Sequence, residues 1–376
     1  MGTLFDYLAW RGDLGFDQAP LNEVDSLIFS LLSYIEYKNI VSETHRGEPV
    51  SLQAAANAFF ARNPDPKKIS MGLIVPKDIL KLFKMAKECR RFRGVGLKAY
   101  VNRIDLELQM QFSAVTYCLE TGEQVITYRG TDDTLVGWKE NFNMSFMDEI
   151  PAQKHAKEYL VEAAASTKAE LYVTGHSKGG NLAVYSAIHA PIEVKNRLIT
   201  VWCNDGPGFR NAWLHDPKYL DIKAKIKTLL PQSSIVGILL EHEESYSVVK
   251  SSQKGLWQHD GLTWAVVGSK FQRVKDVSED SKRVDKTLKK WIEGLSLDQR
   301  EQFCEALYKV LSADNAMTLT DLVSLKNKWI ARGKSLDPEV HQVLRTTLKA
   351  LFEASASIKS GKALDGADAS AMKKGS

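Results

Sequence analysis

Residues 171–180 read LYVTGHSKGG and place Ser177 between Gly175 and Gly179 in the pattern G-x-S-x-G. In this pattern the serine stands on a sharp turn between a strand and a helix, where its hydroxyl can attack a carbonyl. The turn leaves no room for side chains two positions before and after the serine, which accounts for the two glycines. The pattern predicts a serine nucleophile for acyl transfer; the alternative is a chance pair of glycines around a surface serine.

Such a nucleophile needs hydrogen-bond donors for the negative oxygen that forms during the reaction. A helix starting after Ser177 would direct its first backbone N–H groups, beginning with that of Lys178, at this oxygen. A second donor must come from an earlier loop. The segment TYRGTDDTLVGW (127–138) follows a predicted strand and is the candidate. Within it, Arg129 is expected to pair with a carboxylate and hold the loop in place.

The reaction also needs a base within reach of the serine and an acid that orients the base, in the chain order serine, acid, histidine. His259 is the first choice for the base, because LWQHDGLTW is a loop bounded by glycine and tryptophan just before a strand-like segment. His242 is the reserve, and a surface histidine is the alternative for each. His189 lies too far along the nucleophile helix, and His341 falls in a late helical region.

The elements around Ser177 are predicted from periodicity and from turn residues. Strands are expected at 111–120, 124–130, 169–176, 196–205 and 226–237, the first two as a hairpin. Helices are expected at 21–37, 51–62, 76–92, 155–168 and 178–190. Because strands and helices alternate between 155 and 240, the sheet should be mostly parallel with crossover helices. Ser177 then falls at a strand-to-helix turn, as the pattern requires.

Strand signals fade beyond residue 270, where helices are expected at 285–295, 298–311, 319–333 and 337–354. The predicted organisation has four parts. Residues 1–105 form an N-terminal helical region integrated with the hydrolase domain, and 106–270 form its α/β core. Residues 271–355 form a C-terminal helical region, and 356–376 form a disordered tail rich in small residues and lysine.

Two segments resemble a known family. YRGTDDTLVGWKENFNMSF (128–146) resembles the FRG[ST]…W segment of the fungal-type class 3 lipases in the α/β-hydrolase superfamily. GHSKGGNLA (175–183) resembles their GHSLGGALA elbow. This resemblance covers about 115–265. It implies an α/β-hydrolase fold, a carboxylic or lipid ester substrate, His259 as the late histidine, and the position of Thr131 as the second oxyanion donor.

A closer resemblance is to an uncharacterised, lipase-like bacterial family, a domain of unknown function. It is carried by DYLAWRGDLGF (6–16), NDGPGF (204–209) and QHDGLTW (258–264), and it extends over most of the chain. It brings no established substrate. From residue 133 to residue 151, where class 3 lipases begin a lid, few residues are free to form one. The apolar side chains there, Trp138, Phe142, Met144, Phe146 and Met147, are expected to be mostly core, with some lining an acyl pocket.

The acid departs from the class 3 pattern. Those lipases place an aspartate after the strand that corresponds to 226–231, and Ser234 stands at that position here. A serine cannot stabilise an imidazolium as a carboxylate does. Asp205, at the end of the preceding strand, is the predicted acid, although it could instead only cap its turn. Glu241, Glu243, Glu244 and Asp260 are the reserves.

Composition limits the function classes. The chain has 376 residues, a formal net charge of +4 and four widely spaced cysteines, so a disulfide framework, a zinc site and nucleic-acid binding are not indicated. The N-terminus lacks the apolar core of a signal peptide, and no apolar run is long enough to span a membrane, so a cytoplasmic protein is expected. Eight lysines and arginines between Lys81 and Arg103 are expected to form a solvated surface, with contact to anionic lipid as the alternative.

The sequence predicts a serine esterase or lipase-like hydrolase that needs no cofactor or metal. A segment EHEES (241–245) lacks the spacing of a helical zinc motif. The alternative is a hydrolase fold without catalysis that serves as a binding or scaffold module. The absence of an aspartate at 234 and the long helical C-terminus favour that alternative.

Overall fold

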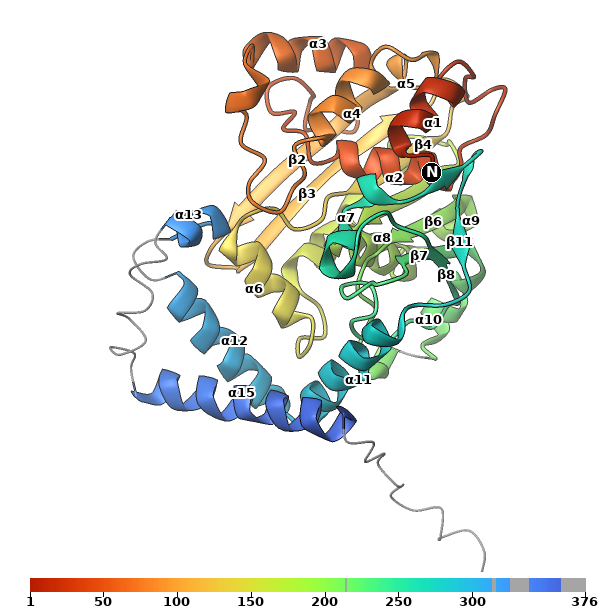
Figure 1. Ribbon diagram of the computed structural model, residues 1–376. Coiled ribbons are helices and arrows are strands. Elements are labelled where there is room, and N and C mark those ends of the chain that lie inside the picture. The colour runs from red at the N-terminus through yellow and green to blue at the C-terminus, as the bar shows by residue number, and fades with distance from the viewer. Residues whose placement is uncertain (214, 313–315, 325–337, 360–376) are drawn as a thin grey trace, which may run out of the picture.

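The computed structural model describes residues 1–213, 215–312, 316–324 and 338–359 (Figure 1). Within these residues one sheet has nine strands in the order β1-β2-β3-β4-β5-β6-β7-β8-β11. The strands are Val50–Ser51 (β1), Gly96–Asp105 (β2), Met110–Cys118 (β3), Gln124–Tyr128 (β4), Leu171–His176 (β5), Leu198–Asn204 (β6), Ile226–Pro231 (β7), Tyr246–Val249 (β8) and Arg273–Val274 (β11). Val266–Val267 (β9) and Lys270–Phe271 (β10) form a separate antiparallel pair.

Strands β4 to β8 are parallel, and β1 to β4 are antiparallel. The predicted hairpin is confirmed: β3 pairs with β4, and Gly122 takes a positive φ of 106° in the turn. The strand β2, paired with β3, was not predicted from the sequence. A sheet that is parallel from β4 to β8, extended by antiparallel strands and placed between helical layers, is the α/β-hydrolase-like architecture that the sequence predicted.

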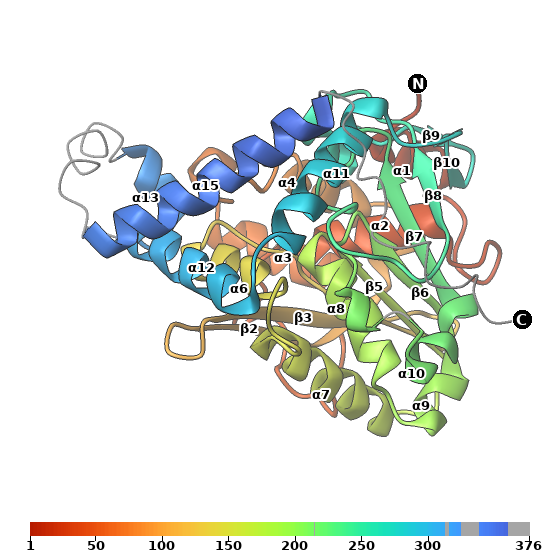
Figure 2. The same ribbon diagram turned by 90° about the horizontal axis from the view of Figure 1, so that it is seen from below.

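Alternate residues of each central strand face two different cores. Val125, Tyr172 and Trp202 pack on the side of the N-terminal helices. Ile126, Val173 and Cys203, their direct neighbours, pack on the opposite side. Because both faces of a parallel sheet are covered, its strands carry almost unbroken apolar runs. Figures 1 and 2 show the two helical layers on either side of the sheet.

The N-terminal layer contains Leu4–Arg11 (α1), Glu23–Leu32 (α2), Leu52–Arg62 (α3), Ile79–Ala86 (α4) and Arg90–Arg93 (α5). The expected single helix over 76–92 is wrong, because α4 ends at Ala86 and α5 begins after Cys89. Helix α2 has a capping box in which the Asn22 side chain accepts from the backbone N–H of Asp25 and the Asp25 side chain accepts from that of Asn22. This layer also holds a short 3-10 helix, Pro66–Lys68 (η1).

The basic stretch from Lys81 to Arg103 is not one solvated surface. Arg91 is 1 % exposed, and its guanidinium lies 2.6 Å from the buried carboxylate of Asp25. It also donates to the backbone carbonyls of Leu14 and Ala19. A buried, fully bonded guanidinium holds the N-terminal segment together and is not available to an anionic ligand.

The opposite layer carries Pro151–Ala165 (α7), Lys178–Ile188 (α8), Ile192–Arg197 (α9) and Pro217–Leu220 (α10). Two short 3-10 helices, Asn211–Trp213 (η2) and Lys223–Lys225 (η3), lie in the loops around α10. The predicted helices at 155–168 and 178–190 correspond to α7 and α8. Helix α8 is buried along its whole length, which fits its position between the sheet and α7.

The C-terminal region is helical, as predicted, with Glu279–Glu293 (α11), Leu297–Leu311 (α12), Leu319–Ser324 (α13) and Pro338–Lys359 (α15). Helix α15 packs across α11 and α12, where the Trp291 indole donates to the carbonyl of Thr347 (Figures 1 and 2). The expected helix over 319–333 is described only to Ser324. Of the expected disordered tail, 356–359 belong to α15, and 360–376 lie outside the described residues.

These helices are joined to the sheet domain at both ends. On one side, Lys289 of α11 forms an ion pair with Glu241 at 2.8 Å. On the other side, Asp133 accepts hydrogen bonds from the backbone and hydroxyl of Thr320. Leu135 of helix α6 (Leu135–Asn143) packs with Leu322 of α13. Among the described residues, no helix combines the length and apolar character that crossing a membrane would require.

Candidate active site

Ser177 lies on a strained turn between β5 and α8. Its φ of 58° and ψ of −133° are unusual for a residue with a side chain. A Cβ at Gly175 would lie 2.0 Å from the Gly179 carbonyl oxygen, and one at Gly179 would lie 2.1 Å from the Tyr128 carbonyl oxygen. Both positions therefore admit only glycine, and the serine is held at the carboxyl edge of the sheet.

Asp205 and His259 form a hydrogen-bonded pair next to this turn. Asp205 Oδ2 lies 2.6 Å from His259 Nδ1, and the carboxylate is fully buried. Asp205 Oδ1 accepts from the Ser234 hydroxyl at 2.5 Å and from the Gly237 backbone N–H at 3.1 Å. Ser234, which the sequence resemblance aligned with the class 3 aspartate, thus hydrogen-bonds the carboxylate that contacts the histidine. Asp205 itself has a positive φ of 50°, a conformation that aspartate tolerates better than most residues.

The loop that carries His259 is fixed from several directions. It is the 3-10 helix Gly255–His259 (η4), followed by a second, Gly261–Thr263 (η5). The buried side chain of Gln258 accepts from the Ser233 N–H, while its backbone carbonyl accepts from the Trp264 indole. His176 Nε2 lies 2.8 Å from the His259 carbonyl oxygen. The imidazole is thereby held beside Asp205 by groups from β5, the β7 loop and its own segment.

Ser177 Oγ and the His259 ring are not joined by a hydrogen bond in this state. The rings of His176 and His259 are tilted by 33° with centroids 4.6 Å apart, which places His259 directly beside the strand end that leads into Ser177. Catalytic hydrogen bonds in free enzymes are often long and tighten only when substrate binds.

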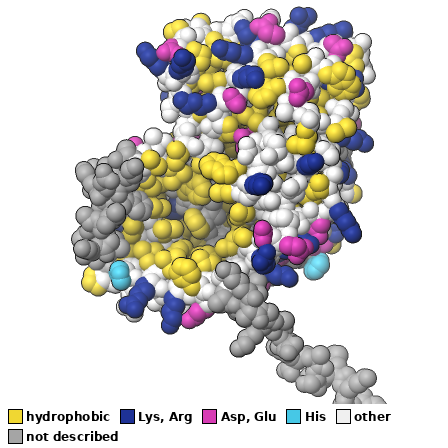
Figure 3. All heavy atoms as spheres, viewed as in Figure 1, with side chains coloured by type: hydrophobic (Ala, Val, Ile, Leu, Met, Phe, Trp, Pro, Cys, Tyr) yellow, Lys and Arg dark blue, Asp and Glu magenta, His cyan; other side chains and the backbone are white. Residues whose placement is uncertain are grey.

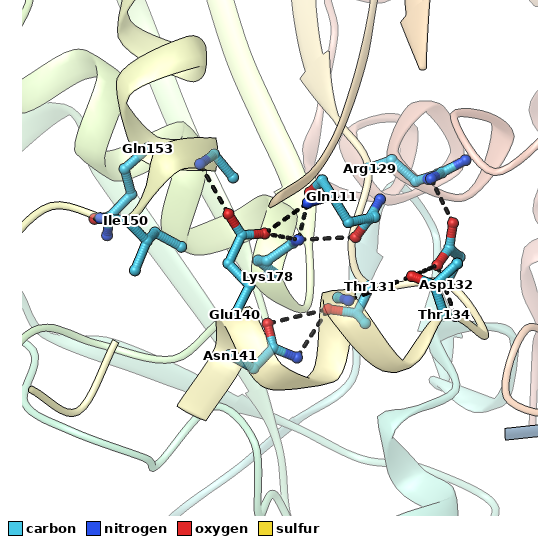
Figure 4. Close-up of polar contacts among 12 residues, drawn as sticks. Gln111, Arg129, Thr131, Asp132, Thr134, Glu140, Asn141, Ile150, Gln153 and Lys178 are labelled. Carbon is cyan, nitrogen blue, oxygen red and sulfur yellow. Dashed lines mark hydrogen bonds and ion pairs between the residues drawn. The ribbon is translucent and has the colours of Figure 1, made fainter. Parts of the chain in front are cut away.

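The loop 129–134 also reaches the serine. A Cβ at Gly130 would lie 3.0 Å from Ser177 Cβ and 2.6 Å from the His176 carbonyl oxygen, so this residue touches the turn directly. Arg129 donates to Asp132 at 2.8 Å and to Asn102 at 3.2 Å, the structural role that the sequence predicted. The Thr131 hydroxyl is bonded to Asn141 of α6 (Figure 4). Within the described chain, neither the Thr131 nor the Lys178 backbone N–H donates to another group.

The side chain of Lys178 is buried in a network that sequence reasoning missed. Its Nζ lies 2.7 Å from Glu140 Oε2 and donates to the Gln111 backbone carbonyl and side-chain oxygen (Figure 4). Glu140 also accepts from the backbone N–H groups of Ala152 and Gln111. Burial lowers the pKa of Lys178, and the Glu140 carboxylate opposes that shift. The pair ties the start of α8 to β3, α6 and α7.

The Glu140→Gln variant is expected to lose about 3–5 kcal/mol of unfolding free energy, because it leaves the Lys178 ammonium buried without its counter-charge. Urea unfolding measures this loss. The matched control is Asp280→Asn, which breaks the exposed ion pair with Arg283 and should cost below about 1 kcal/mol. Equal effects of the two variants would contradict the assignment of Lys178 and Glu140 as a charged pair.

The other histidines that follow Ser177 lie elsewhere. His242, the reserve base, bonds to Glu244 at 3.1 Å and to the Gly237 carbonyl at 2.7 Å. Burial alone would lower the pKa of His242, but Glu244 outweighs it and the pKa is raised. Glu244, one of the reserve acids, is thus hydrogen-bonded to His242. Burial alone would raise the pKa of Glu244, but its contacts, His242 foremost, outweigh burial and the pKa falls to about 2. His189 packs on Tyr185 and Trp213, and His215 and His341 are exposed.

Three histidines with depressed pKa values predict a pH-dependent stability. Burial lowers the pKa of His176 to about 3 and those of His45 and His189 to about 4. The unfolded chain, with a histidine pKa near 6.5, binds more protons in this range, so the unfolding free energy should fall as the pH drops from about 6.5 toward 4. His242 acts in the opposite direction, so a single-site comparison is needed.

Urea unfolding of the wild type and of His45→Gln, at about pH 7 and about pH 5, makes that comparison. The variant should lose less stability over this interval. An equal loss in both proteins would contradict a neutral, buried His45.

The apolar residues between 133 and 151 are less buried than expected. Of the five named from the sequence, Met144 is buried, whereas Trp138, Phe146 and Met147 are half-buried and Phe142 is exposed. Asp260, a reserve acid, accepts from the Leu262 N–H and caps η5. Glu241 and Glu243, the remaining reserves, form ion pairs with Lys289 and Lys223. The described residues contain no cluster of side chains suited to hold a metal ion.

Comparison with known families assigns the chain. Residues 86–309 match the model of the Mbeg1-like family. The chain belongs to the Mbeg1-like family. The match begins at the last residue of α4 and ends within α12. It includes the β5–α8 turn, Asp205 and His259, and helices α1 to α3 lie before it.

Solved structures that are similar to this Mbeg1-like chain include a lipase. It is described as the crystal structure of M37 lipase, with 18 % sequence identity and a TM-score of 0.35, covering 57 % of this chain and 68 % of that one. No curated protein matches the sequence.

Proposed function

We propose that this Mbeg1-like protein is a serine hydrolase that cleaves carboxylic esters through Ser177, His259 and Asp205. The observation that carries the proposal is the 2.6 Å contact between the buried Asp205 carboxylate and His259 Nδ1, beside a serine held at a φ of 58°. A serine hydroxyl, a carboxylate and an imidazole in this order along the chain form the set that acyl transfer requires.

In the first half of the reaction, His259 Nε2 takes the proton of the Ser177 hydroxyl as Oγ attacks the ester carbonyl carbon. The backbone N–H groups of Thr131 and Lys178 donate to the oxygen that becomes negative. Asp205 accepts a hydrogen bond from the Nδ1–H group of His259 and stabilises the imidazolium with its negative charge. The imidazolium then returns its proton to the leaving alkoxide as the carbon–oxygen bond breaks, which leaves an acyl-enzyme and an alcohol.

In the second half, a water molecule gives a proton to His259 and attacks the acyl-enzyme carbonyl. The same two N–H groups hold the second oxyanion. When it collapses, the proton on His259 passes to Ser177 Oγ, so the free serine and the carboxylic acid are produced. No metal or cofactor takes part in these steps.

Lipid esters are the substrate class that the surface favours. Figure 3 shows a hollow lined largely by hydrophobic side chains, and α6, α11, α12 and α15 border it in Figure 1. Phe142 of α6 and Leu348 and Phe352 of α15 are exposed, and an open groove of about 610 Å³ on α15 is lined by Leu348, Phe352 and three charged residues of that helix. Helix α6 directly follows the Thr131 loop and therefore connects the border of this hollow with the candidate oxyanion donors. Large exposed apolar surfaces of this kind mark binding sites.

The alternative, a binding module without catalysis, drew on the absence of an aspartate at position 234. Asp205 supplies a carboxylate to His259 and Ser234 hydrogen-bonds it, so the pair does not lack its acid. This arrangement supports the enzyme over the alternative.

The test is hydrolysis of p-nitrophenyl acetate, octanoate and palmitate by the full chain, before and after treatment with a fluorophosphonate. Octanoate or palmitate should be cleaved with a higher kcat/KM than acetate, and treatment should abolish cleavage of all three. A folded protein that cleaves none of them, or whose activity survives treatment, would contradict the proposal. A preference for acetate would contradict only the assignment of the hollow as the acyl site and would leave the hydrolase function standing.

A further inference from the structure

Tyr34 brings a hydroxyl from the N-terminal layer to the candidate active site. It follows α2 and lies outside the residues that match the family model. A Cβ at Gly130 would lie 2.2 Å from Tyr34 Oη and 3.0 Å from Ser177 Cβ. The tyrosine hydroxyl and the serine side chain therefore lie against the same face of Gly130. This residue directly precedes Thr131, whose backbone N–H is a candidate oxyanion donor.

The hydrogen of this hydroxyl is only loosely held. His176 Nε2 faces the carbonyl oxygen of His259, which can only accept, so Nε2 must carry the ring hydrogen. Burial lowers the pKa of His176 to about 3, so the ring is neutral and its Nδ1 is an acceptor. Tyr34 Oη lies 3.5 Å from that Nδ1, a distance well beyond a normal O–H hydrogen bond.

The hydroxyl also stays protonated. Burial raises the pKa of Tyr34 above its ordinary value, so the group remains a donor throughout the neutral pH range. Its side chain is half-buried, and its Oη lies against Gly130 and His176, next to the turn. The Gly130 backbone N–H bonds the hydroxyl oxygen, but the hydroxyl hydrogen has only the long contact with His176, so it can turn toward a new acceptor at little cost.

We propose that Tyr34 is a third oxyanion donor, whose O–H bonds the negative oxygen alongside the Thr131 and Lys178 amides. This inference rests on the proposed hydrolase function. No proton is transferred from Tyr34: its hydrogen bond to the neutral substrate carbonyl strengthens as that oxygen becomes an anion, and the long contact with His176 is given up. A donor that acts mainly in the transition state raises kcat and leaves KM nearly unchanged.

The experiment compares wild type, Tyr34→Phe and Tyr37→Phe with p-nitrophenyl octanoate. Tyr37→Phe is the matched control, because it removes another hydroxyl of the same layer, one that donates to the Leu32 carbonyl. Tyr34→Phe should lower kcat about 10- to 100-fold with KM within about twofold, while Tyr37→Phe keeps the wild-type kcat. Titration of the active serine with a fluorophosphonate corrects each kcat for any misfolded fraction.

Two further measurements separate the donor role from a positioning role. The pH profile of kcat for Tyr34→Phe should keep the wild-type midpoint, because removal of a neutral donor to the oxyanion changes no charge near the catalytic base. An alkylboronic acid, which forms a tetrahedral adduct on the serine, should bind Tyr34→Phe more weakly by about the same 10- to 100-fold as kcat falls.

Equal kcat values for Tyr34→Phe and Tyr37→Phe would overturn the inference and leave the proposed function intact. A shifted pH midpoint, or unchanged boronic acid affinity, would show that Tyr34 does not act by donating to the oxyanion and would also overturn the inference. If the wild type neither hydrolyses esters nor reacts with the fluorophosphonate, the proposed function fails, and the inference fails with it.

Discussion

The Ser177→Ala variant is expected to hydrolyse esters about 10⁴- to 10⁶-fold more slowly than the wild type while it unfolds at a similar urea concentration. The substitution removes only the hydroxyl group, and the oxygen of that group is the atom that forms the acyl-enzyme bond. Nothing in the structure replaces it, since the turn at a φ of 58° presents this one side chain between Gly175 and Gly179. Initial rates with p-nitrophenyl octanoate, at matched protein concentration, measure the loss.

Ser186→Ala is the matched control for this variant. Ser186 lies on the same helix, α8, is buried, and donates to the Ala183 carbonyl. It should keep the wild-type rate, so a fall in both variants would point to damage of α8 rather than to loss of the nucleophile. A Ser177→Ala protein that retains the wild-type rate would exclude Ser177 as the nucleophile.

The Asp205→Asn variant is expected to lower kcat about 10³- to 10⁴-fold. The carboxylate accepts the Nδ1 hydrogen of His259, which leaves Nε2 free to take the serine proton. An amide of the same shape can donate to Nδ1 instead, and the ring hydrogen then moves to Nε2, where it blocks proton transfer. Asparagine also cannot stabilise the imidazolium with a full negative charge. Single-turnover rates, measured at a pH where the wild type is fully active, report the chemical steps of the reaction without product release.

Asp260→Asn provides the comparison, because Asp260 follows His259 directly but its side chain caps η5 through the Leu262 N–H, a bond that asparagine can also accept. This variant should stay within about threefold of the wild type. If Asp260→Asn lost as much activity as Asp205→Asn, the acid would be assigned wrongly. A nearly active Asp205→Asn protein would contradict the triad itself.

Local features of the site could be read from the sequence because each depends on a few neighbouring residues. The G-x-S-x-G turn needs glycines at fixed positions, and a strand and helix on either side of it show in the apolar pattern. Asp205 could be predicted from its position at the end of a strand in a parallel sheet, because the carboxyl ends of such strands lie at one edge of the sheet. Ser234 could be seen as a departure, but not as a partner of Asp205, which depends on the path of the β7 loop.

Contacts between distant segments could not be predicted in this way. The buried Arg91 was expected at the surface because its partner, Asp25, lies 66 residues earlier. Lys178 offered one signal: a lysine stands where the class 3 elbow has leucine, and a charge at an apolar position calls for a buried partner. Nothing local identified that partner as Glu140, nor placed Tyr34 against Gly130, because the three-dimensional approach of α6 and α2 sets both contacts.

The most direct test of an activated serine is the intact mass of the full chain after fluorophosphonate treatment, with wild type and Ser177→Ala treated side by side. The account predicts one adduct on the wild type and none on the variant. A wild type that is folded by urea unfolding but gains no adduct, or a Ser177→Ala protein that is labelled to the same extent, would contradict the assignment of Ser177 as the nucleophile.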